Sequence, residues 1–114
     1  MLFSDFKTGP VAHLFAALGK DWSAILTDAQ SYEELRQAVI EHNDKDIGRF
    51  VGAARRYAGV CSSGEYRLLL AVLAFADFGH VADDLSRGRA WQDITRGCDS
   101  DFRAAIAACV KASP

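Results

Sequence analysis

The most strongly apolar stretch of the chain lies in its second half. Residues 65–78 are EYRLLLAVLAFADF, and every side chain from Leu68 to Ala76 is apolar. A helix that is apolar on all of its faces has to be buried on all of them. The stretch is shorter than the roughly 20 residues that a membrane-spanning helix needs. It therefore predicts a central helix that the rest of the chain surrounds.

The residues that flank this stretch supply start and stop signals for a helix. Ser62, Ser63 and Gly64 can cap its first turn, and Glu65 suits the positive end of a helix. Gly79 follows the apolar run and is expected to end the helix. The central helix is thus predicted over residues 65–78.

Apolar residues in the rest of the chain recur with helical spacing, and glycines or capping residues separate the segments. No alternation of period two persists, so no strand is predicted. The segments with helical spacing are 10–19, 21–26, 31–42, 46–59, 81–88, 91–97 and 99–110. Short helices of this kind pack as a compact bundle. The fold class is therefore all-α, with about seven to eight short helices around residues 65–78.

Length and patterning predict one helical domain over residues 1–114. Residues 1–9 have no clear period and are expected to form an N-terminal arm packed on the core, and residues 111–114 a frayed tail. Ile47 and Val110 continue the apolar stripes of their helices and are expected to face inward. Trp22 and Trp91 are both expected to be core residues.

Composition narrows the function classes. Half of the residues are hydrophobic and the net charge is −2, so the basic excess typical of nucleic-acid binding is absent. The three cysteines include no C-x-x-C pair, which favours reduced thiols and a cytoplasmic protein. No metal or phosphate motif is present in the sequence, so no cofactor is expected. The first ten residues do not resemble a secretory signal. No membrane association is expected.

One cluster has the spacing of a metal or acid/base site. His80, Asp83 and Asp84 stand at i, i+3 and i+4, so a helix would bring a ring nitrogen and two carboxylates to one face. A histidine held by neighbouring carboxylates explains the same pattern without chemistry. A metal-dependent enzyme that uses these residues is therefore one alternative function, and no metal is assigned.

Two further groups have chemical and structural interpretations. Cys61 lies near the positive end of the central helix, where the pKa of a thiol can fall, but without a base partner it is expected to be a packed residue. Ser62 and Ser63 precede Gly64, yet the G-x-S-x-G pattern of a nucleophile turn is absent. Helix capping accounts for these serines.

The helix over residues 46–59 offers the most usable surface. Small residues and arginines lie opposite its apolar stripe, and Gly48 adds a second glycine. Glycine in a helix interior costs about 1 kcal/mol relative to alanine, which predicts close approach of another backbone. That neighbour is either another helix of the core or a partner protein with an acidic face. The predicted partner-binding residues are Arg49, Gly52, Ala53, Arg55 and Arg56.

The helices over residues 31–42 and 46–59 also allow a helix-turn-helix interpretation. The turn between them lacks the glycine usual in this motif, and the arginines of the second helix are few for a recognition face. A helical DNA-binding transcriptional regulator is nevertheless the first alternative function, ahead of the metal-dependent enzyme.

Part of the chain resembles a class of known proteins. SSGEYRLLLAVLAFADF at residues 62–78, AWQDI at 90–94 and DSDFRAAIAAC at 99–109 are similar to small α-helical proteins of bacterial phages and mobile elements that carry an S-G-E-x-x-L-L helix. The resemblance implies a protein that blocks or regulates a partner, as anti-CRISPRs, antitoxins and immunity proteins do. The leading hypothesis is thus a non-enzymatic protein-binding module, and its partners include a second copy of the same chain as an alternative to a different protein.

Overall fold

The structure is a computed structural model that describes residues 1–96 and 100–114. These residues form nine helices and no strand, which confirms the predicted all-α fold. The additional helix lies in the N-terminal arm. The helices are α1 (Phe3–Phe6), α2 (Pro10–Leu18), α3 (Lys20–Asp28), α4 (Tyr32–Lys45), α5 (Arg49–Ala58), α6 (Ser63–Phe75), α7 (Gly79–Ser86), α8 (Ala90–Thr95) and α9 (Ser100–Ala112).

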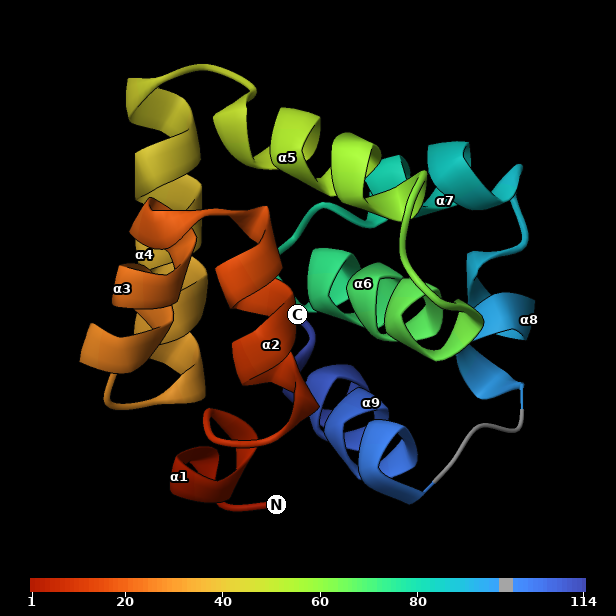
Figure 1. Cartoon of the computed structure of the whole chain (residues 1–114), viewed down its shortest axis with the longest axis horizontal. Helices are drawn as coiled ribbons and strands as arrows, with labels where there is room; N and C mark the ends of the chain where they lie inside the picture. The colour runs from red at the N-terminus through yellow and green to blue at the C-terminus, as the bar shows by residue number, and fades with distance from the viewer. Residues whose placement is uncertain (97–99) are drawn as a thin grey trace.

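Helix α6 lies at the centre of the molecule, as the apolar run predicts (Figure 1). Helices α2, α5, α7, α8 and α9 pack against it, while α3 and α4 form an outer layer against α2 and α5. Each side chain from Leu68 to Leu73 is at most 1% exposed. Burial on all faces explains how a helix without a polar stripe is stable in this fold.

The start of α6 is a capping box. The Ser62 hydroxyl accepts a hydrogen bond from the Glu65 backbone N–H at 3.3 Å, and the Glu65 carboxylate accepts one from the Ser62 N–H at 3.2 Å. The Tyr57 hydroxyl of α5 also donates to Glu65. Capping is thus the structural role of Ser62, and Glu65 joins the start of α6 to the end of α5.

The end of α6 differs from the prediction. The helix stops at Phe75, and Gly79 is the first residue of α7. Asp77 adopts a left-handed conformation with φ 71°, and the Phe78 N–H donates to the Leu73 carbonyl at 2.7 Å. Aspartate tolerates this conformation better than most residues do. Asp77 therefore provides the turn that the sequence assigns to Gly79.

Arg36 joins three helices at one end of the bundle. Its guanidinium donates to the Phe75 carbonyl of α6 at 2.8 Å, to the Ala112 carbonyl of α9, and to the Glu33 carboxylate at 2.6 Å. A cation is favourable where the carbonyls of two helix ends converge. Helix α9 extends through Lys111 and Ala112, two residues that the sequence assigns to a frayed tail.

The N-terminal arm packs on the domain, as predicted, and forms the short helix α1. Phe6 is 1% exposed and contacts the Phe75 ring, with 6.3 Å between the ring centroids. The Tyr32 hydroxyl donates to the Met1 carbonyl at 2.9 Å. The arm therefore contributes the buried Phe6 to the core, and the partly buried Phe3 packs against it.

Three apolar residues expected inside are exposed. Ile47 is 93% exposed because α5 begins only at Arg49, which leaves Ile47 in the connection before the helix. Trp91 of α8 is 63% exposed and Val110 of α9 is 38% exposed. The prediction of inward positions is wrong for all three. No helix in the described part of the chain has the length and hydropathy to cross a bilayer.

Candidate functional site

Helix α5, which carries the predicted partner-binding residues, is fixed by a buried amide. Gly48 is the N-cap with φ 80°, so it lies outside the helix interior, contrary to the prediction. The Asn43 side-chain oxygen accepts a hydrogen bond from the Phe50 N–H at 2.9 Å, and Asn43 itself is buried. Asn43 therefore satisfies a donor of the first turn that no capping side chain reaches.

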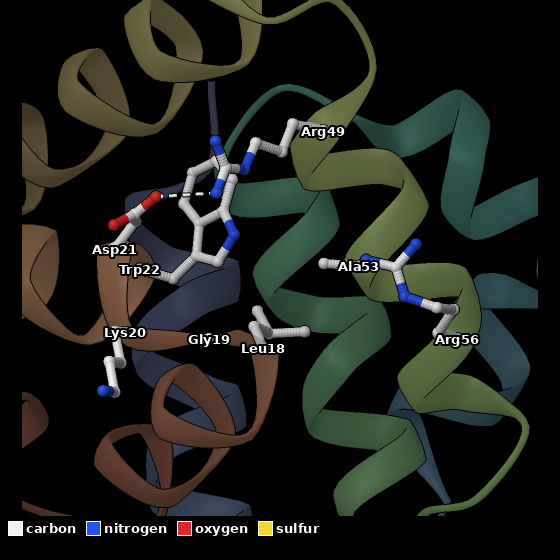
Figure 2. A pocket seen from close by; sticks show the side chains of 8 residues that line it. All are labelled: Leu18, Gly19, Lys20, Asp21, Trp22, Arg49, Ala53 and Arg56. Carbon is white, nitrogen blue, oxygen red and sulfur yellow. Dashed lines mark ion pairs between the residues drawn. The ribbon is translucent and has the colours of Figure 1, made fainter.

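Arg49 is engaged within the chain. Its guanidinium lies 2.8 Å from the Asp21 carboxylate of α3 and 3.4 Å from Asp46. Figure 2 shows the side chain reaching across from α5 to Asp21 of α3, with a dashed line for the ion pair. Asp21 lies in the first turn of α3 but does not cap the helix, because Gly19 is the N-cap. Asp21 instead neutralises Arg49.

The other residues of the predicted strip have different surroundings. Arg55 pairs with Asp84 of α7 at 3.4 Å, whereas the exposed Arg56 side chain has no ion pair with a described residue. Ala53 is 4% exposed and so does not lie opposite the buried face. A Cβ on Gly52 would meet only the Arg56 guanidinium, at 3.4 Å. Among the described residues no backbone of another helix approaches Gly52, so internal packing does not explain this glycine, and docking of a partner there stays a prediction.

A polar pocket of about 340 Å³ lies between α5 and the turn from α2 to α3. Exposed Lys20 and Arg56 stand on its rim, and Arg49 lies there with its Asp21 partner. Such a rim favours a carboxylate from an acidic partner. The lining residues are Leu18, Gly19, Lys20, Asp21, Trp22, Arg49, Ala53 and Arg56.

The residues of the predicted metal or acid/base cluster are all exposed on α7. Asp84 pairs with Arg55, and the His80 ring lies beside Phe78 with 6.3 Å between centroids. Within residues 1–96 and 100–114, no group of three His, Cys, Asp or Glu side chains could hold a metal ion. The structure therefore adds no ligand to His80, Asp83 and Asp84.

The ionisable groups near the start of α6 are shifted by their hydrogen bonds and burial. The Ser62 side chain, followed by the Tyr57 hydroxyl, lowers the pKa of Glu65. Burial and the Glu65 carboxylate raise the pKa of Tyr57. Burial also raises the pKa of Cys61 and of the fully buried Cys109, so the lowered Cys61 pKa considered from the sequence is wrong. Cys98 lies outside the described residues.

An apolar groove between α8 and α9, which the sequence did not reveal, forms a second surface. It has a volume of about 470 Å³, and the exposed Trp91 and Val110 lie on it beside the buried Ile94 and Ile106. Its lining residues are Trp91, Ile94, Thr95, Arg96, Arg103, Ile106, Ala107, Val110 and Lys111. A tryptophan on a six-residue helix between arginines was the available signal. We name this surface the α8–α9 groove.

Comparisons with known proteins give the chain no family. No protein-family model, no curated protein and no solved structure matches it. The resemblance to small phage and mobile-element proteins therefore stays a prediction.

Proposed function

We propose that the chain is a non-enzymatic protein-binding module that inhibits or regulates a partner protein by occupying its surface. The observation that carries this proposal is the exposure of Trp91 in the α8–α9 groove. Tryptophan and arginine are enriched among the residues that dominate protein–protein binding. Covering the exposed part of Trp91 would contribute about 2 kcal/mol to association.

The composition of the α8–α9 groove supports the same proposal. Ile94 and Ile106 form an apolar centre, while Arg96, Arg103 and Lys111 provide a polar rim. Protein interfaces commonly combine an apolar centre with a polar rim in this way. Small single-domain proteins of phages and mobile elements, which part of the sequence resembles, often act by binding a partner.

The polar pocket is a second contact region in this proposal. Arg56 and Lys20 are exposed without ion pairs among the described residues, so they are available to acidic side chains of the same partner. Arg49 and Arg55 would first have to leave Asp21 and Asp84. We therefore assign most of the binding free energy to the α8–α9 groove and a smaller part of it to Arg56.

The test is a binding experiment with matched variants. Wild-type protein captures partners from lysate, and each is identified, purified and titrated by calorimetry against wild type, Trp91→Ala, Arg56→Ala and Ile47→Ala. Ile47 is the control because it is exposed but lies outside the groove. The proposal requires a partner whose binding is lost in Trp91→Ala and kept in Ile47→Ala. Equal binding by all four proteins would contradict it.

A further inference from the structure

The lining residues of the α8–α9 groove are spaced as in a binding site for a helix. Residues Arg103, Ile106, Ala107 and Val110 of α9 stand at i, i+3, i+4 and i+7, so they follow one face of that helix. Trp91 and Ile94 of α8 form the opposite wall. From Arg103 to Lys111, α9 rises about 12 Å, which is roughly two helical turns.

The charge around this groove has one sign among its described residues. Three cations line it, and none of the described lining residues is acidic. Arg96 follows α8 and Lys111 lies in the last turn of α9, so positive charge is found near both ends of the Arg103–Lys111 face. Arg96 and Lys111 are exposed and have no ion pair with another described residue. Anionic groups of an occupant would find partners there.

We propose that the α8–α9 groove binds an amphipathic helix of the partner protein, with apolar side chains at i, i+3 or i+4 and i+7 and acidic residues flanking them. This inference rests on the proposed function and adds the chemistry of the partner. Helices bind apolar grooves through such a stripe. A helix also satisfies its own backbone hydrogen bonds, which an extended segment against Ile94 and Ile106 would not.

The probes are two synthetic peptides of about 15 residues, because shorter helices are marginal in water. Both carry the same leucine stripe and lack aromatic residues. One has glutamates on its flanks, and the other has lysines at the same positions. Binding is followed by the fluorescence of Trp91, since Trp22 is 2% exposed and already shielded from water.

The expected result has three parts. The acidic peptide binds one to one with a blue shift of Trp91 emission, and roughly tenfold more tightly than the lysine peptide. The double variant Arg96→Glu/Lys111→Glu reverses this preference. Calorimetry shows binding reduced at least about thirtyfold in Trp91→Ala and unchanged in Ile47→Ala, the control outside the groove.

Several results would overturn the inference. Equal affinity for both peptides would remove the role of charge. A dimer that buries Trp91 without peptide, or a blue shift with anionic lipid vesicles but with neither peptide, would assign the groove to another occupant. If neither peptide binds while a purified partner still depends on Trp91, the acidic helix is wrong and the proposed function stands. If the partner binds Trp91→Ala as well as wild type, the proposed function fails.

Discussion

Helix α5 satisfies most of its polar groups within the chain, whereas the α8–α9 groove leaves large apolar side chains in contact with water. Carboxylates of α3 and α7 neutralise Arg49 and Arg55. In the α8–α9 groove, Trp91 is 63% exposed although its helix packs on α6. Contacts among the described residues account for Arg49 and Arg55 of α5, but none of these contacts explains the exposed position of Trp91. Under the proposed function, α5 therefore contributes mainly to stability and the α8–α9 groove mainly to binding.

The largest expected effect is on partner binding by Trp91→Ala. Loss of an interface tryptophan should weaken binding by at least about 2 kcal/mol, or roughly thirtyfold. The free energy of unfolding should change by no more than about 0.5 kcal/mol, because the side chain is 63% exposed. Calorimetric titration and urea unfolding measure the two quantities. A large loss of stability with normal binding would reverse the roles of the two regions.

Asn43→Ala should have the opposite outcome. It leaves the buried Phe50 N–H without its acceptor, which should destabilise the fold by about 1 to 2 kcal/mol. Partner affinity should stay unchanged below the unfolding transition. Urea unfolding measures the loss, with Asp44→Ala as the control because Asp44 is the exposed neighbour. Equal stability of the two variants would show that Asn43 does not hold α5.

Glu65→Gln tests the contact between α5 and α6 through its pH dependence. A group whose folded-state pKa is lowered stabilises the fold above its unfolded-state pKa, and this contribution is lost as pH falls through the folded-state value. At pH 7 the free energy of unfolding of the wild type should exceed that of the variant by about 1 kcal/mol. This difference, measured by urea unfolding, should disappear when the pH falls below the usual pKa range of a glutamate side chain. A constant difference across pH would contradict this role for the Glu65 charge.

Gly52→Ala should stabilise the fold. Alanine is favoured over glycine in a helix interior by up to about 1 kcal/mol, and the added Cβ meets only the flexible end of Arg56. Thermal unfolding should show a gain of about 0.5 kcal/mol in the free energy of unfolding. Ala58→Gly at the end of α5 serves as the reverse substitution and should lower this free energy. Destabilisation by Gly52→Ala would restore the prediction that another backbone approaches α5.

The smallest expected effects concern the arginines of α5. Arg49→Ala should lower the free energy of unfolding by about 0.5 kcal/mol, because the ion pairs of Arg49 are about half exposed and screened by water. Arg56→Ala should leave stability unchanged within error, since it breaks no ion pair among the described residues. Urea unfolding in low and high salt measures both. A larger loss for Arg56 than for Arg49 would contradict the assigned partners.

The central helix could be predicted because its signals are local. The uninterrupted apolar run and the capping residues Ser62, Ser63 and Gly64 need no knowledge of the rest of the chain. The structure then identifies Ser62 as the cap, in a capping box with Glu65. The predicted end of the helix was wrong because both Asp77 and Gly79 can adopt a left-handed conformation. Which of them does so depends on the backbone hydrogen bonds that follow Leu73, and these are not visible in the sequence. Local sequence thus identified the element but not its last turn.

The candidate site could be predicted only in part because it depends on contacts between distant residues. The sequence identified Arg49, Arg55 and Arg56 but did not show that Asp21 and Asp84 neutralise two of them. Trp91 was placed in the core because its apolar character does not reveal which neighbours cover it. Contacts that join distant elements, such as Arg36 to α6 and α9, have no local signal.

Hydroxyl-radical footprinting of the partner complex tests the division between α5 and the groove most directly. Oxidation of Trp91 is compared between free and bound protein, with the exposed Ile47 and Val60 as references outside the α8–α9 groove. The account predicts strong protection of Trp91 and little change at the two references. Full oxidation of Trp91 in the complex, with protection confined to the side chains of α5, would contradict it.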